Sequence, residues 1–208
     1  MNRPMRTRTL VSAASALLAL SFSTLGSSAL AQDRGTPRMP RHDRDAIQLD
    51  TVDAPSTSVD FGRARGIVDA PFAEVVEIVH DYASYRHFMP HFLASRVLAR
   101  RGNRAQVYME VGILRDTITL WAQVQIRSRT EGDKTIVEAS MTQGNMETFR
   151  AIWTLEPHAN GQRTIAELQL LVDPDLPAVP NSVITSENVS SARKAITRLR
   201  RRVLEVRS

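Results

Sequence analysis

Residues 189–203 read VSSARKAITRLRRRV and decide the fold, because they predict a long helix with one apolar side. Apolar residues recur there at intervals of three or four, namely Val189, Ala192, Ile196, Leu199 and Val203. This spacing places them along one face of an α-helix, and the arginines fall on the opposite side. Such a helix needs an apolar surface to cover, which the rest of the chain must supply.

That surface is predicted to be an antiparallel sheet. The first strand is expected between Val59 and Ile67, and the later strands at residues 94–100, 105–113, 117–127, 135–141, 147–155 and 164–172. Apolar and polar residues alternate within several of these ranges, as they do along Ile118, Leu120 and Ala122. Turn sequences that contain glycine separate many of the ranges. One apolar face per strand and short connections favour an antiparallel arrangement.

Two short helices are predicted between the first strand and the second. Asp69 suits the N-cap of the first helix, and Pro71 suits its first turn, where the missing N–H is not needed. Apolar residues from Phe72 to Val79 recur at helical spacing, and a second helical turn is expected before Pro90. The sequence thus predicts an α+β fold. It consists of a curved antiparallel sheet of about seven strands, two short helices after the first strand and a long C-terminal helix across the sheet.

The N-terminal segment has the features of a cleavable signal peptide. Arginines near the start are followed by an apolar stretch at residues 11–25 and by small residues at the ALA sequence of 29–31. The apolar stretch is shorter than the roughly 20 residues that a membrane-spanning helix needs. We therefore expect residues 1–31 to be removed and the mature protein to be periplasmic or secreted.

Residues 32–57 predict a flexible leader before a single domain at residues 58–208. The leader carries Pro, Gly, Asp and Arg with few large apolar side chains, so it cannot bury enough surface to offset its ordering entropy. The chain has no cysteine, which excludes disulfides, thiolate nucleophiles and metal sites with cysteine ligands.

The positive charge of the chain is concentrated near its C-terminus. The basic residues there include Arg193, Lys194, Arg198, Arg200, Arg201 and Arg202. They predict either a solvated helix face or a peripheral contact with an anionic membrane. Nucleic acid is not an expected partner, because no aromatic residues are interleaved with the basic ones for base stacking. A monomer is expected.

Three motifs stand at the junctions of the predicted elements: DAPFAEV at residues 69–75, DYASYRHFMP at 81–90 and WTLEP at 153–157. In this order and spacing they resemble the START-like, or helix-grip, superfamily. The similarity is greatest to its polyketide cyclase/dehydrase and coenzyme-Q-binding-protein-like branch. It extends over roughly residues 58–205, nearly all of the predicted domain.

The resemblance implies a cavity between the sheet and the last helix that takes an apolar or aromatic small molecule. The residues it places around the ligand are Phe88, Phe92, Met109, Val111, Leu120, Met141, Phe149, Trp153, Leu168, Leu170, Ile184 and Ile196. Of these, Phe88 and Phe92 are expected near the mouth of the cavity. The same residues could simply fill a core. Only an inner volume that the side chains leave open distinguishes the two interpretations.

The sequence contains no recognisable catalytic constellation and predicts no metal or cofactor. The polar residues that could approach a cavity are Tyr85, His87, Glu110, Arg115, Asp116 and Arg150. Strand alternation places Glu110 and Arg150 on the solvent face. His87 and His91 have the spacing of two ligands on one helical turn, but Pro90 interrupts that turn and no third ligand is near in sequence.

The leading hypothesis is an exported, non-enzymatic binding protein for a hydrophobic ligand such as a lipid, a quinone or a polyketide-like compound. A cyclase or dehydratase built on the same cavity is the first alternative, and it requires a titratable side chain facing inward. The second alternative is an interaction module with a filled inner face. Its basic helix would meet an anionic partner or membrane, with binding that weakens as salt is raised.

Overall fold

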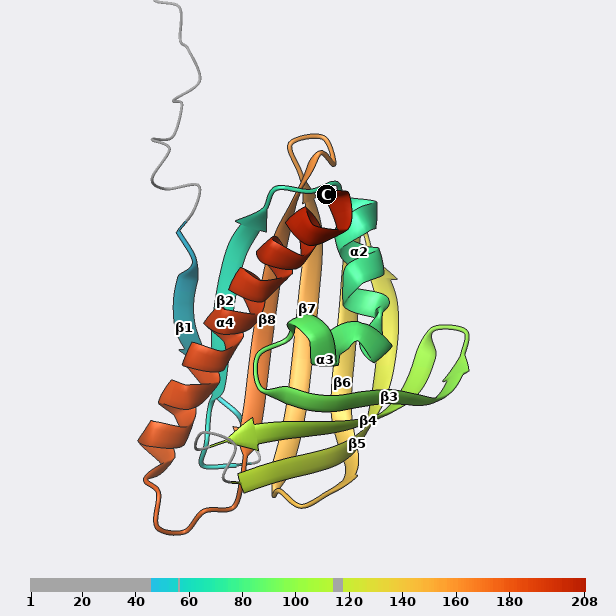
Figure 1. Cartoon of the computed structure of the whole chain (residues 1–208). Helices are drawn as coiled ribbons and strands as arrows, with labels where there is room; N and C mark the ends of the chain where they lie inside the picture. The colour runs from blue at the N-terminus through green and yellow to red at the C-terminus, as the bar shows by residue number, and fades with distance from the viewer. Residues whose placement is uncertain (1–45, 56, 114–117) are drawn as a thin grey trace, which may run out of the picture. The chain divides into compact units, whose positions relative to one another are not determined.

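Eight antiparallel strands form one sheet in the order β1-β2-β8-β7-β6-β5-β4-β3 (Figure 1). The computed structural model describes residues 46–55, 57–113 and 118–208. The strands are β1 (Gln48–Val52), β2 (Phe61–Val68), β3 (Phe92–Arg101), β4 (Arg104–Ile113), β5 (Ile118–Glu131), β6 (Lys134–Gly144), β7 (Thr148–His158) and β8 (Arg163–Asp173). Consecutive strands from β3 to β8 pair as neighbours, and β2 closes the series by pairing with β8.

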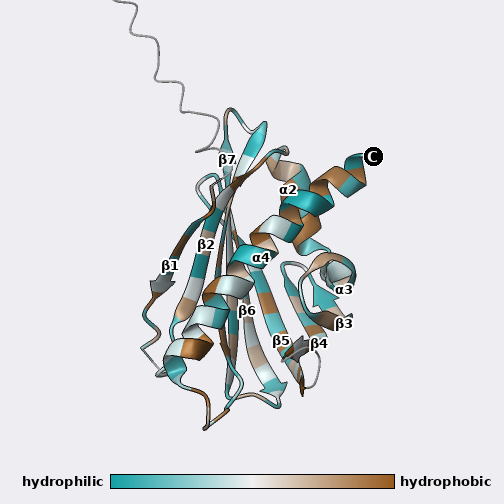
Figure 2. Ribbon diagram, turned by 60° about the vertical axis from the view of Figure 1, so that its left-hand side comes forward, coloured by the Kyte–Doolittle hydropathy of each residue, from teal (hydrophilic) through white to brown (hydrophobic). Residues whose placement is uncertain are grey.

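The helices lie on one face of this sheet. Helix α2 (Phe72–His80), the short 3-10 helix η1 (Tyr82–Ser84) and α3 (Tyr85–Phe88) connect β2 to β3, and α4 (Asn181–Arg207) follows β8. Figure 2 shows α4 crossing the sheet, with hydrophobic and hydrophilic residues alternating along its length. This arrangement confirms the predicted α+β helix-grip fold. No helix in the described part of the chain is both long and apolar enough to span a membrane.

Strand β1 was not predicted, because the sequence interpretation placed its residues in the flexible leader. It pairs with β2 from Gln48↔Arg65 to Val52↔Phe61, so the sheet has one strand more than expected. Most of its side chains are exposed. An edge strand held by backbone hydrogen bonds and by an ion pair between Asp50 and Arg63 needs few apolar residues, and this explains why no sequence pattern revealed it.

Helix α4 approaches β2 closely because the strand face beneath it carries small residues. Gly62, Ala64 and Gly66 are buried there, whereas Arg63 and Arg65 point to the opposite face. A Cβ atom added at Gly62 would lie 2.1 Å from the backbone carbon of Asn188. Only glycine therefore permits this helix position.

Polar contacts also hold α4 to the sheet. The Asn188 side chain is buried; its Nδ2 donates to the carbonyls of Asp60 and Val172 at 3.3 Å each, and its Oδ1 accepts from the Val172 N–H at 3.2 Å. Further along, Arg200 Nε donates to the Ile67 carbonyl at 2.9 Å. Buried backbone groups need such partners, so these contacts set the position of the helix on β2 and β8.

The core lies between the sheet and the helices. Leu155 on β7 and Ile196 and Leu199 on α4 are fully buried, and the apolar residues of α2 pack against the same cluster. Near the C-terminus, Arg207 Nη2 lies 2.8 Å from a carboxylate oxygen of Glu74, which links the end of α4 to α2. The core is therefore continuous below the C-terminal half of α4.

Candidate functional site

A cavity of about 540 Å³ lies between the sheet and the N-terminal half of α4. Its walls come from β3 to β8, from η1, α3 and the connection to β3, from the β8–α4 connector and from α4. The wall side chains are mostly apolar and the volume falls within the range of small-molecule sites, roughly 300–1,000 Å³. The inner face of the sheet is therefore not filled by its own side chains.

Most of the ligand-contacting residues predicted from the resemblance lie in this cavity wall. They are Phe92, Met109, Val111, Leu120, Phe149, Trp153, Leu168, Leu170 and Ile184. Strand alternation had grouped these residues by face, and the observed register keeps each strand's set on one side. Whether they contact a ligand stays a prediction.

Three predicted wall residues lie elsewhere. Phe88 is buried beside Tyr85, at 5.5 Å between ring centres, and beneath the guanidinium of Arg202. Met141 packs near Gly144 toward the end of β6. Ile196 is fully buried where α4 meets Gly66, so it belongs to the helix–strand contact. The helical period placed Ile196 on the correct face, but it could not show where along the helix the cavity ends.

The sequence interpretation missed a group of wall residues from the segment between α2 and β3 and from α4. They include Tyr82, Met89, His91, Glu187, Ser191 and Lys194, and Ser95 on β3 was missed as well. Ser191 and Lys194 lie on the same side of α4 as Ile184 and Asn188, and this helical spacing was the only available signal. The contribution of the segment before β3 depends on how it folds back over the sheet.

The polar groups deep in the cavity are already hydrogen-bonded to the backbone. Ser95 Oγ donates to the Tyr82 carbonyl at 2.6 Å, and the Tyr85 hydroxyl donates to the Val79 carbonyl at 2.6 Å. Burial raises the pKa of Tyr85 well above its ordinary value, and the nearby Tyr82 and Asp81 act in the same direction. The Tyr85 hydroxyl thus stays protonated and engaged. It is poorly suited to act as a general acid or base.

The other candidates for chemistry lie outside the cavity or outside the described residues. Glu110 accepts a hydrogen bond from the Tyr108 hydroxyl at 2.5 Å and does not line the cavity. The exposed Arg150 lies over the ring of Phe61, with 5.8 Å between guanidinium and ring centre. His87 is exposed and accepts from Arg86 Nε at 3.0 Å.

Arg115 and Asp116 lie outside the described residues, so the structure does not place them. The described ranges contain no group of three or more His, Asp or Glu side chains able to hold a metal ion. His87 ends up on α3 and His91 in the connection that follows, where it lines the cavity rim. The two histidines therefore lie in different environments.

The basic residues of α4 have different environments. Arg200 bonds to the Ile67 carbonyl, and Arg201 and Arg202 contact Glu205 at 3.1 and 3.6 Å. Arg193 and Arg198 are exposed. Three of the basic residues thus interact with groups of the protein itself, which leaves fewer cations for a membrane than the sequence count suggested. Contact with an anionic membrane stays a prediction.

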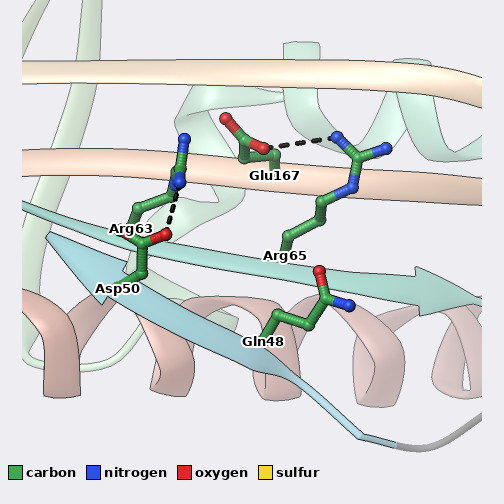
Figure 3. A pocket seen from close by; sticks show the side chains of 5 residues that line it. All are labelled: Gln48, Asp50, Arg63, Arg65 and Glu167. Atoms are coloured by element: carbon green, nitrogen blue, oxygen red, sulfur yellow. Dashed lines mark hydrogen bonds and ion pairs between the residues drawn. The ribbon is translucent and has the colours of Figure 1, made fainter. Parts of the chain in front are cut away.

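A second, polar pocket of about 300 Å³ lies on the other face of the sheet (Figure 3). Gln48, Asp50, Arg63, Arg65 and Glu167 line it. Its cations are paired, because Arg63 contacts Asp50 and Arg65 lies 3.4 Å from Glu167 (Figure 3). Such partly exposed pairs contribute about 0–1 kcal/mol each, and the pocket is best described as an ion-pair network between strands.

Comparison with known proteins agrees with the fold. The family model described as "Polyketide cyclase / dehydrase and lipid transport" matches residues 68–185. Human StAR-related lipid transfer protein 5 is similar with a TM-score of 0.66 and 11% identity, over 80% of this chain and 91% of that one.

Two bacterial structures are also similar. The STAR-related lipid transfer protein from Xanthomonas axonopodis gives a TM-score of 0.64 at 16% identity, over 76% of this chain and 98% of that one. A START superfamily protein from Mycobacterium smegmatis gives 0.62 at 19% identity, over 70% and 98% of the respective chains. No curated protein matches the sequence. These identities are low, so the solved structures support the fold, and the family match supports the family.

Proposed function

Because the chain belongs to the polyketide cyclase/dehydrase and lipid transport family, we propose that it is an exported protein that binds a hydrophobic small molecule between the sheet and α4. The observation that carries the proposal is the cavity of about 540 Å³, which apolar side chains line without filling. A lipid, a quinone or a polyketide-like compound has the apolar surface that such a wall favours.

The energetic basis of binding is burial of the ligand's apolar surface. Each methylene moved from water into the cavity contributes about 0.8 kcal/mol. Trp153, Leu168 and Phe149 are buried at the cavity wall and offer contact without needing to become ordered on binding. A homologous series of ligands should therefore bind more tightly as the chain lengthens, until the cavity is full.

Binding is favoured over catalysis by the state of three polar side chains of the cavity, whereas the titratable Glu187, His91 and Lys194 lie at its rim. Ser95 and Tyr85 both donate to backbone carbonyls, and Asn188 is engaged with β2 and β8. A general acid or base has to reach a ligand and exchange a proton with it, which these side chains cannot do without losing those bonds. The unfilled cavity likewise argues against the interaction-module alternative, which requires a filled inner face.

Export rests on the N-terminal sequence alone. When the chain is expressed with residues 1–31 included, the expected outcome is secretion of a protein that begins at Gln32. Intact-mass measurement of the product from the periplasm or the medium checks this directly. A product that keeps residues 1–31, or that stays in the cytoplasm, would contradict export while leaving the binding proposal intact.

The binding test uses tryptophan fluorescence. The chain has two tryptophans, of which Trp153 lines the cavity and Trp121 stacks on Tyr108 outside it. In a Trp121→Phe background, straight-chain alcohols of increasing length should change the emission of Trp153. Their affinity should rise about fourfold per methylene and then level off. Native mass spectrometry of the purified protein should detect a co-purified apolar compound.

Replacing either of two alanines by phenylalanine distinguishes a cavity position from a core position. Ala139 on β6 lines the cavity, whereas Ala192 on α4 is fully buried and does not. Ala139→Phe should abolish alcohol binding with little loss of stability. Ala192→Phe should destabilise the protein by about 1–3 kcal/mol or more through overpacking. If no alcohol binds the parent and no apolar compound is retained, the proposed function is wrong.

A further inference from the structure

The rim of the cavity is polar at one end and apolar at the other. Along α4 the rim begins with the exposed Val183, passes Glu187 and Ser191, and reaches Lys194. These residues follow helical spacing, so they form one edge of the helix facing the opening. Across from Lys194 lies His91, in the connection between α3 and β3.

Lys194 and His91 meet across this opening. The Nζ atom of Lys194 lies 3.5 Å from Nε2 of His91, a contact that links α4 to the opposite wall. In this contact the Lys194 ammonium, which has donors only, donates to Nε2 of His91. An oxyanion beside the pair can accept from a remaining N–H of Lys194 and, when Nε2 of His91 carries a proton, from His91 as well. The contact brings together residues that are far apart in the sequence.

The charge of Lys194 is not neutralised by a neighbouring carboxylate. None of the ion pairs among the described residues involves Lys194. Glu187 is the other charged residue of the wall, and it lies seven positions earlier on α4, or roughly 10 Å along the helix axis. The cationic end of the rim is therefore separate from its acidic position.

The backbone holds His91 in place. Its φ angle is 65°, a left-handed conformation that is uncommon for a residue with a side chain. The Gly112 N–H donates to the His91 carbonyl at 2.9 Å, which anchors this conformation to the end of β4. Uncommon backbone conformations persist where the surrounding structure holds them, and they cluster at binding sites.

Directly inside the His91–Lys194 contact the wall becomes aromatic and apolar. Phe92 follows His91 and packs edge-to-face on Tyr85, with ring centres 5.8 Å apart. Both rings line the cavity. A ligand with an acidic head between Lys194 and His91 would thus place its apolar body against Phe92 and Tyr85 and then along the cavity wall.

We propose that the cavity takes an amphiphile with an anionic head group, and that Lys194 and His91 bind that head at the rim. This inference rests on the proposed function, because it assigns the ligand class of the same cavity. Lys194 supplies the charge, and His91 supplies a second hydrogen-bond donor from the opposite wall. Neutral ligands of the same length lack the charge-assisted contact and bind more weakly.

The experiment compares a straight-chain fatty acid with the primary alcohol of the same chain length, at a pH at which the acid is ionised. The parent protein should bind the acid about tenfold or more tightly than the alcohol. Lys194→Met should remove this preference by weakening the binding of the acid. Lys194→Glu should disfavour the acid and favour the matching primary amine.

Two further variants serve as controls. Arg198→Met removes the same charge from an exposed position of α4 that does not line the cavity, and it should keep the preference for the acid. His91→Asn keeps a donor and a side chain that tolerates positive φ, so it should lose only part of the preference.

The outcomes separate this inference from the proposed function. If the parent binds acid and alcohol equally well, the anionic-head inference is wrong while the binding function stands. The same holds if Arg198→Met lowers the preference as much as Lys194→Met, because general surface charge would then be responsible. If neither probe binds at any chain length, the proposed function fails and the inference fails with it.

Discussion

The two long edges of α4 face very different surroundings. One edge lies on β2, where glycine and alanine leave no space and Asn188 bonds to the strand backbone. The other edge faces β3, β4 and β5, which run across the sheet at an angle to β2 and β8 (Figure 1). Between that edge and those strands lies the cavity of about 540 Å³.

The difference shows that the size of the strand side chains does not by itself determine whether a cavity forms under the helix. The closely packed edge has the smallest strand residues, Gly62 and Gly66, whereas the open edge faces large ones such as Met109 and Leu120. A straight helix anchored on one side of a twisted sheet diverges from the other side. Anchoring at β2 therefore creates the cavity over β4 and β5.

The largest expected effect comes from breaking the closely packed edge. Gly62→Val should lower the free energy of unfolding by about 3 kcal/mol or more, because the added side chain meets helix backbone that cannot move locally. Chemical denaturation measures this change. Gly66→Ala is the matched control: its Cβ meets side chains rather than helix backbone, with Arg200 Nη2 at 2.9 Å and Ile196 Cγ2 at 3.3 Å, so a smaller loss of about 1–2 kcal/mol is expected. Equal losses for the two variants would argue against tight docking at Gly62.

A leucine pair sharpens the comparison between core and cavity. Leu155 is fully buried and does not line the cavity, whereas Leu170 is partly exposed and does. Leu155→Ala should destabilise the protein by about 3–5 kcal/mol without changing alcohol affinity. Leu170→Ala should cost about 1–2 kcal/mol, because part of its surface already faces open space, and should change alcohol affinity several-fold. Thermal unfolding and Trp153 fluorescence check the two effects, and similar effects on binding would contradict the distinction.

The smallest expected effect is a pH dependence of the free energy of unfolding that arises from His80 on α2, which contacts Ser128 on β5. His80 Nε2 lies 2.9 Å from Ser128 Oγ, and burial, assisted by the charge of Arg100, lowers the pKa of His80. The unfolded chain, with a histidine pKa of about 6.5, then binds a proton more readily than the folded protein. The free energy of unfolding should therefore fall as pH drops below about 6.5, and level off below the folded pKa.

His80→Gln should flatten this part of the stability profile while keeping a side chain that can bond to Ser128. Urea denaturation at a series of pH values provides the measurement. His158→Gln, at the C-terminal end of β7, is the control for loss of a histidine elsewhere in the sheet. A His80→Gln profile with the parent slope would show that another group causes the pH dependence.

Much of the fold could be predicted because it is encoded in local patterns. Alternation along Ile118, Leu120 and Ala122 and the helical recurrence from Val189 to Val203 identified the strand and the covering helix. Strand β1 has no such pattern, since its side chains are mostly exposed and its pairing is by backbone. The expectation of a cavity came from the resemblance of the short motifs, because periodicity alone does not predict a cavity.

The site was predicted less completely. Trp153, Leu168 and Leu170 line the cavity, on the strand face that residue parity indicates, and their contact with a ligand stays a prediction. Ile196 packs against Gly66 and does not line the cavity, and helical spacing could not reveal this because the helix presents the same face at both places. Lys194 and His91 were not predicted to meet, because no sequence pattern relates a helix position to a connection a hundred residues earlier.

Apart from β1, the sequence by itself determined which elements form and which face of each is apolar, because backbone geometry converts residue spacing directly into faces. Only the tertiary structure decided where α4 touches the sheet and where it leaves a cavity. That outcome depends on the close contact at Gly62, the angle of the strands and the return of the α3–β3 segment over the opening. These are relations between distant segments, and packing of the whole chain sets them.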